Sequence, residues 1–174
     1  NDVWHLCRYS IKATSFTGMY VDGDRERIPY EADSYINALA HFGSDSEYTI
    51  ARRSIDHLVF CPTWPTEWHL YLVIAAWTEF LWSGDDRLLR ERFDELTAKL
   101  LLPLRNADGL LDTSSVPEAL LESIHFTGRV TEHFSHVGVR DIVDWPQSER
   151  DDYDMRPVNT VINALHYRAL MAHA

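Results

Sequence analysis

An all-α fold built from paired inner and outer helices is predicted by two features of the 174-residue sequence. Apolar residues recur at helical spacing in successive segments, and no segment shows the convincing alternation of a strand. Helices with one apolar stripe also alternate with helices that are more apolar or carry unusual polar residues. This order is typical of two helical layers, in which the outer layer meets water and the inner layer is covered by protein.

The predicted outer helices span residues 46–60 and 86–101. Each has a single apolar stripe and charged residues on its remaining face, as expected of a helix with one wet side. The predicted inner helices span 30–42 and 67–82, and a last helix opens at Pro157. The 67–82 segment is apolar almost all round and is therefore expected to be surrounded by protein.

Less regular sequence lies before and between these helices. Residues 1–19 have no clear assignment, and 103–156 is expected to be largely irregular, with a short helix at 117–124. The chain does not begin with Met, and its last residues still have helical character. We therefore expect residues 1–174 to be one partial domain that is truncated at both ends.

Charge and apolar patterning exclude several classes of function. The net charge is −11, from 27 acidic and 16 basic residues, so the surface should repel nucleic-acid phosphates. The most apolar stretch, 70–82, contains Glu79 and is too short to span a bilayer. Cys7 and Cys61 are expected to be free, buried thiols rather than a disulfide. We therefore expect neither a nucleic-acid partner nor a membrane span.

The sequence carries no pattern typical of a metal, serine-hydrolase or nucleotide site. His133 and His136 lie near Glu132, but no second carboxylate or cysteine has zinc-ligand spacing nearby. The Gly-x-Ser-x-Gly motif and the Gly-rich phosphate loop are both absent from the sequence. We therefore expect no metal and no cofactor.

Most of the unusual chemistry precedes the predicted inner helices. It falls in residues 16–29, in 61–67 and in the last part of 103–156. In an antiparallel arrangement of paired layers, every inner helix starts at the same end of the domain. Three polar and aromatic loops should then meet at one rim, which is where we expect a functional site.

The densest charge cluster is Asp22-Gly23-Asp24-Arg25-Glu26-Arg27, which lies between Tyr20 and Tyr30. A solvated surface loop would also have this composition. The alternating charges and flanking tyrosines favour carbohydrate binding, because aromatic rings stack on sugars and carboxylate–arginine pairs fix hydroxyl groups. Arg25 is accordingly expected to bind substrate. Crowded carboxylates should raise the pKa of at least one of them, while the two arginines act in the opposite direction.

Two further segments combine aromatic rings with acids. Trp64 lies between two prolines, and both a ligand-facing wall and a core position remain open for it. Trp68 is expected to pack into the core, and Glu67 to stabilise the start of the next helix through the helix dipole. Asp144 and Trp145 precede a charged run, which favours sugar binding over an acidic surface loop.

A known family shows these motifs in the same order. The run from Tyr20 to Asp33 resembles the signature of bacterial and fungal α-L-rhamnosidases, glycoside hydrolase family 78. The resemblance continues over nearly the whole chain, through the segments 64–68, 82–85 and 144–159. It implies an (α/α)6 barrel, a ring of paired inner and outer helices, of which this chain would be about the first half.

The resemblance also implies roles for residues in the first motif. Glu26 matches the general acid that protonates the leaving glycosidic oxygen. Tyr30 and Asp33 resemble residues that line the rhamnose subsite, and Asp22 resembles a further binding aspartate. The implied substrate is a polysaccharide or glycoside with terminal α-L-rhamnose, and export from the cell is implied as well.

Two features of the family point beyond the first motif. Trp145 resembles an aromatic wall of the same pocket, and Trp77 is a weaker candidate for such a wall. Enzymes of the family invert the anomeric centre, so the acid works opposite a carboxylate base about 6.5–9.5 Å away. That base is a glutamate from the later half of the barrel. The resemblance therefore implies a base beyond Ala174 and an inactive fragment.

Two alternatives remain open at the level of sequence. An (α/α)6 glycosidase with another sugar specificity would have the same fold, because the chemistry of the pocket and not the fold sets the substrate. A helical module that binds sugar without catalysis would carry the same aromatic and acidic residues.

Overall fold

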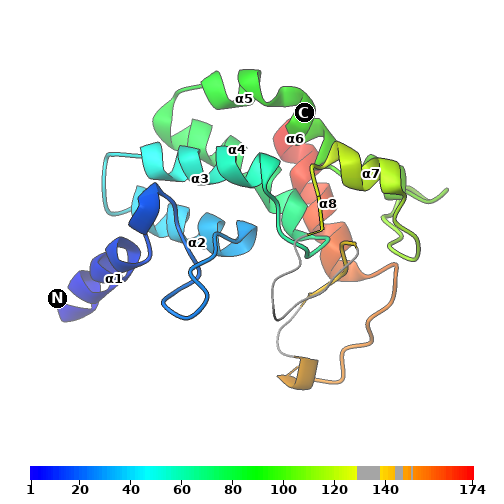
Figure 1. The fold of residues 1–174 in the computed structure, drawn as a ribbon, viewed down its shortest axis with the longest axis horizontal. Coiled ribbons are helices and arrows are strands. Elements are labelled where there is room, and N and C mark those ends of the chain that lie inside the picture. Colours follow the sequence, from blue (N-terminus) through cyan, green and yellow to red (C-terminus); the bar gives the residue numbers. More distant parts are fainter. Residues whose placement is uncertain (129–137, 144–146, 150) are drawn as a thin grey trace.

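The computed structural model describes residues 1–128, 138–143, 147–149 and 151–174 (Figure 1). Every regular element that it contains is a helix, as the sequence predicts. The helices form two layers, and α4 (Trp68–Ser83) packs against α2 (Glu31–Phe42) on one side and α8 (Thr160–His173) on the other. These three helices form the predicted inner layer.

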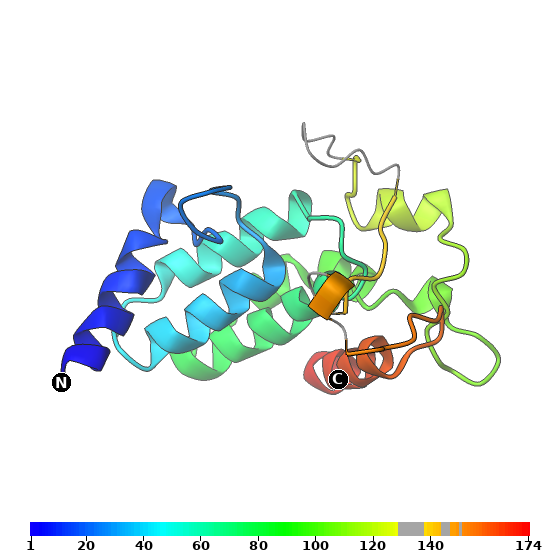
Figure 2. The same cartoon turned by 90° about the horizontal axis from the view of Figure 1, so that it is seen from below.

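The second layer consists of the helices that precede each inner helix in the chain. It contains α1 (Asp2–Ala13), α3 (Thr49–Phe60), α5 (Arg87–Glu91) and α6 (Phe93–Ala98). The α3 helix contacts both α2 and α4, while α5 and α6 contact α4. Figure 2 shows α1 at one end of the molecule and the C-terminal α8 toward the other.

Short helices complete the connections. The predicted helix at 117–124 is present as α7 (Glu118–Ser123), which begins directly after Pro117. Single turns of 3-10 helix lie at η1 (Phe16–Gly18), η2 (Leu102–Leu104) and η3 (Gln147–Glu149). None of the described helices is both long enough and apolar enough to cross a membrane.

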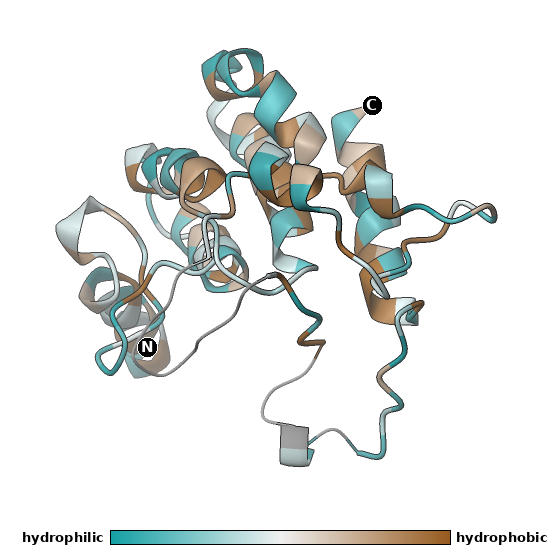
Figure 3. Ribbon diagram, turned by 45° about the vertical axis from the view of Figure 1, so that its right-hand side comes forward, coloured by the Kyte–Doolittle hydropathy of each residue, from teal (hydrophilic) through white to brown (hydrophobic). Residues whose placement is uncertain are grey.

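The main core lies where α3, α4, α6 and α8 meet. Leu58, Leu70, Ala76 and Ala169 are fully buried there, and α4 contributes six of the buried core residues. Hydrophobic and hydrophilic segments alternate along most of the surrounding helices (Figure 3). The predicted burial of α4 is found along most of its length, but at its C-terminal end Leu81 and Trp82 are exposed, so the expectation that protein surrounds the whole helix is wrong there.

The structure corrects three details of the predicted helices. Residues 86–101 do not form one helix, because Arg92 leaves helical geometry with φ −120° and ψ 20°. The guanidinium of Arg92 instead binds Asp56 on α3, with Nε 2.6 Å from Oδ1, and lies over the Phe60 ring. The last helix begins at Thr160 and not at Pro157, because the Asn159 side chain accepts a hydrogen bond from the Ile162 N–H.

The third correction concerns residues 1–19, which contain α1. Only Ile11 of this helix is buried, and Val3, Trp4 and Leu6 remain exposed. Cys7 lies on the exposed part of α1, and Cys61 is half-buried. Both thiols are free, as expected, but the expectation that both are buried is wrong.

Candidate active site

The charged loop that begins after Tyr20 is anchored by buried groups. Tyr20 is fully buried, its backbone N–H donates to Ser54 Oγ at 3.0 Å, and its hydroxyl lies 2.6 Å from His41 Nδ1. The Val21 N–H donates to the Thr14 carbonyl at 2.8 Å. Tyr20 therefore holds the loop to α3 and cannot stack on a sugar, so only Tyr30 of the two flanking tyrosines remains available.

Ser54→Ala is expected to reduce the free energy of unfolding by about 1–3 kcal/mol, because the buried Tyr20 N–H would lose its acceptor. Urea unfolding of the purified protein measures this loss. Ser44→Ala serves as the control, since its hydroxyl bonds only nearby carbonyls of α2 in the exposed turn at residues 40–44. Equal stabilities of the two variants would contradict the assigned anchor.

The loop itself is closed by backbone and side-chain bonds. The Asp22 N–H donates to the Ile28 carbonyl, and the Ile28 N–H donates to Asp22 Oδ1, both at 3.0 Å. Arg27 has a left-handed backbone with φ 58°, and its guanidinium donates to Asp24 Oδ1 at 2.5 Å. These bonds turn Arg27 toward Asp24 while Arg25 and Glu26 face a pocket.

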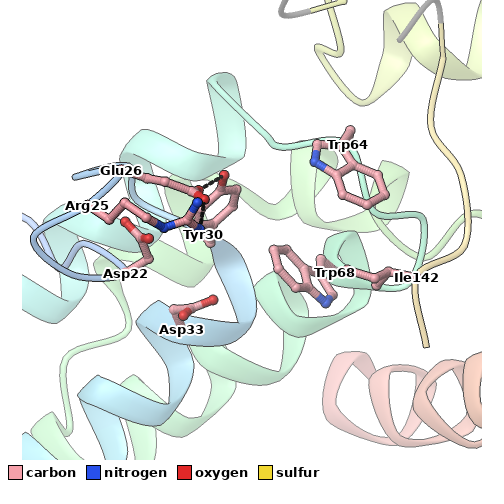
Figure 4. Close-up of a pocket in the computed structure, with 8 residues that line it drawn as sticks. All are labelled: Asp22, Arg25, Glu26, Tyr30, Asp33, Trp64, Trp68 and Ile142. Atoms are coloured by element: carbon pink, nitrogen blue, oxygen red, sulfur yellow. Dashed lines mark hydrogen bonds and ion pairs between the residues drawn. The ribbon is translucent and has the colours of Figure 1, made fainter. Parts of the chain in front are cut away.

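The pocket brings together residues from separate parts of the chain (Figure 4). Its volume is about 270 Å³, close to the lower end of the roughly 300–1,000 Å³ of sites for small molecules. It is lined by Asp22, Arg25, Glu26, Tyr30, Asp33, Trp64, Trp68 and Ile142. Two of the three predicted loops, 16–29 and 61–67, thus meet at one site, and the described part of 103–156 contributes Ile142.

Glu26 is held by two neighbours in this pocket. The Tyr30 hydroxyl donates to Glu26 Oε2 at 2.7 Å, and Arg25 forms an ion pair with Oε1. The Glu26 side chain is 22% exposed, whereas that of Arg25 is 86% exposed. Because exposed ion pairs contribute little, the hydrogen bond from Tyr30 is the stronger restraint on the carboxyl group.

The crowded carboxylates affect Asp33 and Tyr30 most clearly. Burial raises the pKa of Asp33, and the nearby charges of Asp22 and Glu26 raise it further. Burial and the hydrogen bond to Glu26 also raise the pKa of Tyr30, so its hydroxyl keeps its proton and remains a donor. The pKa of Asp33 is therefore raised chiefly by burial, and the expected repulsion between carboxylates makes only a smaller contribution.

Two tryptophans form the wall opposite the charged loop (Figure 4). Trp68 is half-buried and meets the Tyr30 ring edge-on at 5.4 Å, so the expectation that it packs into the core is wrong. Trp64 also lines the pocket, and the Arg140 guanidinium lies 4.5 Å from its ring centre. Trp77 packs against Phe80 and does not line the pocket.

A buried carboxylate behind the pocket joins two of its walls. Glu31, at the first position of α2, is 1% exposed and accepts a hydrogen bond from the Thr63 N–H at 2.7 Å and another from the Thr63 hydroxyl. Burial raises its pKa, and the charge of nearby Lys99 opposes that rise. Lys99 is also buried, and its pKa falls to about 7. Glu31 thus fixes the segment before Trp64 to the helix that carries Asp33.

A sequence model described as bacterial alpha-L-rhamnosidase 6 hairpin glycosidase domain matches residues 1–118, well over half of the 174 residues. The chain belongs to this family. No match was found among curated proteins or among solved structures. The resemblance noted in the motifs is thereby confirmed, together with the all-helical fold class of a six-hairpin glycosidase.

The matched part of this α-L-rhamnosidase domain contains every pocket residue except Ile142. Family membership indicates a glycosidase with a glycoside as its substrate. Asp144 and Trp145 lie outside the described residues, as do His133 and His136. Within the described residues, no group of three or more His, Cys, Asp or Glu side chains is arranged to hold a metal ion.

For two contributors to the pocket, the sequence did not indicate the role that the structure shows. Ile142 lines the pocket, but an isolated aliphatic residue in an irregular segment carries no signal of such a role. Glu67 was expected to act on the helix dipole. It does lie at the N-cap of α4, but it is 2% exposed and also accepts hydrogen bonds from the backbone of residues 142 and 143. Its place between two tryptophans was the one available hint.

Proposed function

We propose that this domain releases terminal α-L-rhamnose from polysaccharides or glycosides by an inverting mechanism, with Glu26 as the general acid. The observation that carries the proposal is the position of the Glu26 carboxyl group. It lies at the edge of a sugar-sized pocket, bonded to the Tyr30 hydroxyl at 2.7 Å, opposite two tryptophans. An acid placed beside a bound sugar is what protonation of a leaving glycosidic oxygen requires.

The remaining pocket residues divide into aromatic and polar groups. Trp64 supplies an apolar face on which a sugar ring stacks. Asp22, Arg25 and Asp33 supply charged hydrogen-bonding groups for the hydroxyls of rhamnose. We assign Asp144 and Trp145 to the same sugar site, on the basis of their motif.

In the proposed reaction, Glu26 donates its proton to the leaving oxygen while a carboxylate base activates water on the opposite face of the sugar. An inverting enzyme needs these two groups about 6.5–9.5 Å apart, so that a water molecule fits between them. We place the base outside residues 1–174, because the family uses a glutamate from the later half of the barrel. Residues 1–174 alone are then an inactive part of the catalytic domain.

The arrangement of helices supports this domain assignment. Within the described residues, α2 and α4 lie against helices of the second layer, and His173 of α8 contacts Phe93 and Thr97 of α6, which corresponds to three helical pairs of a six-hairpin domain. Large apolar side chains on these three helices remain exposed, including Ile36, Leu81 and Met171. Further hairpins of an (α/α)6 barrel would cover such side chains.

The assay that tests the function uses the full-length protein and a panel of p-nitrophenyl glycosides. Release of nitrophenol from the α-L-rhamnoside, well above release from the other sugars, is the expected result. NMR of the first product anomer should show inversion. Preference for another sugar would establish a different glycosidase, and rhamnose affinity without turnover would favour a binding module.

Tyr30→Phe is expected to lower kcat/KM for an aryl rhamnoside roughly tenfold, because the Glu26 carboxyl group loses the hydrogen bond that orients it in the pocket. Steady-state kinetics measure the change. Tyr48→Phe is the matched control, since Tyr48 packs against Phe42 and does not line the pocket. An unchanged kcat/KM in the Tyr30 variant would show that the hydrogen bond from Tyr30 to Glu26 does not contribute to catalysis.

A further inference from the structure

The Glu67 carboxylate holds a distant piece of backbone at the pocket. Oε1 accepts hydrogen bonds from the N–H groups of Val143 at 2.5 Å and Ile142 at 3.2 Å, and Oε2 lies 3.3 Å from the Ile142 nitrogen. Glu67 is 2% exposed, so these bonds are shielded from water. A buried carboxylate is expensive unless its oxygens are bonded, which makes this a specific attachment and not an incidental contact.

The held backbone has a conformation that its sequence disfavours. Val143 has φ 55°, in the left-handed region. A β-branched residue rarely adopts this region, because its side chain crowds the backbone, and such outliers persist only where surrounding bonds enforce them. The hydrogen bond from the Val143 N–H to Glu67 is such a bond.

The same segment meets the tryptophan wall through its backbone. The Arg140 N–H donates to the Trp64 carbonyl at 3.1 Å, and the Thr66 N–H donates to the Arg140 carbonyl at 2.9 Å. The Arg140 guanidinium then lies over the Trp64 ring. Residues 139–143 are therefore aligned with 64–67, and the Ile142 side chain is placed in the pocket with Trp64 and Trp68 (Figure 4).

We infer that Glu67 is a positioning residue for sugar binding, which acts by fixing Ile142 and the tryptophan wall rather than by touching the reacting atoms. This inference rests on the proposed function for its effect on binding. The attachment itself is independent of that function. Asp141 gives the segment a second tether by accepting a hydrogen bond from the Thr113 hydroxyl at 2.6 Å, so loss of Glu67 should loosen the wall without releasing it.

The test compares Glu67→Ala with Glu79→Ala in the full-length protein. Glu79 is a matched control, because it is also buried and lies on α4, where it pairs with Arg52 at 2.6 Å and lines no part of the pocket. Both variants should lose stability. Only Glu67→Ala should raise KM for an aryl rhamnoside, by roughly tenfold through misplacement of the wall, with kcat changed by at most about twofold.

A conservative variant and a measurement of backbone opening complete the design. Glu67→Gln should restore most of the affinity, because its carbonyl oxygen still accepts both N–H bonds. Amide hydrogen exchange in peptides covering 139–143 should accelerate in Glu67→Ala and not in Glu79→Ala. If the alanine variant does not fold, Glu67→Asp replaces it, with Glu79→Asp as control, because the shorter side chain withdraws from the amides.

The outcomes separate this inference from the proposed function. A wild-type protein that neither binds nor hydrolyses rhamnosides contradicts the function, and the exchange comparison then still decides whether Glu67 holds the segment. Equal exchange in the two variants overturns the inference, as does a KM that rises equally in both. A raised KM that Glu67→Gln does not restore would assign the effect to the charge and also overturn it.

Discussion

Glu26→Gln is expected to lower kcat on an aryl rhamnoside by a factor of about 10² to 10⁴, the usual contribution of a positioned general acid. The amide has nearly the same size and still accepts the hydrogen bond from Tyr30. It cannot supply a proton to the leaving oxygen. Substrate binding should therefore change little, so the loss appears in kcat more than in KM.

The leaving group provides a sharper measurement of the same role. A rhamnoside with an alkyl leaving group needs protonation more than a nitrophenyl rhamnoside does, so the loss should be larger for the alkyl substrate. Asp24→Asn is the control, because its side chain lies in the same loop, is 95% exposed and does not line the pocket. An equal loss of kcat on the alkyl and nitrophenyl rhamnosides would show that Glu26 is not the general acid.

Asp33→Asn is expected to have opposite effects on activity and stability. Loss of the charged hydrogen-bonding group should lower kcat/KM by roughly 10- to 100-fold. The same change removes a carboxylate whose charged form is disfavoured by burial and by the charges of Asp22 and Glu26. At neutral pH the variant should therefore be more stable than the wild type, by about 0.5–2 kcal/mol.

The dependence on pH checks the cause of that stabilisation. Folding raises the Asp33 pKa, so the folded protein binds this proton more tightly than the unfolded chain. Asp33 therefore stabilises the folded protein most at pH values below the ordinary pKa of an aspartate. This stabilisation declines as the pH rises to the raised pKa that Asp33 has in the folded protein. Urea unfolding should show the advantage of Asp33→Asn growing over this interval and then levelling. A less stable variant at neutral pH would contradict the assigned environment.

The helical layers were predictable because they depend on local spacing. The single apolar stripe in 46–60 and the almost wholly apolar surface of 67–82 each indicate a layer without reference to any partner. The inner helix at 30–42 was found within one residue of its bounds. By contrast, α1 was missed although its apolar residues recur at helical spacing, and the break at Arg92 follows from a contact with α3 that the local sequence does not contain.

The site was predictable only in part, for a related reason. The meeting of the charged loop with Trp64 follows from helix order, and it is found in the pocket. Tyr20 is buried in the core, whereas Tyr30 lines the pocket. Their surroundings in the sequence are similar and do not reveal this difference. Trp68 was assigned to the core on composition alone, although the start of an inner helix faces the rim as well.

The attachment between Glu67 and Val143 crosses 76 positions of the chain. Joining residues so far apart carries a larger loop-closure cost than forming the local contacts of α2, α3 and α4, and such contacts are typically made late in folding. The aromatic wall is thus completed only after the helices that bear it have packed. A well-formed pocket in this protein consequently requires residues 64–68 and 139–143 to be packed together, in addition to an intact charged loop.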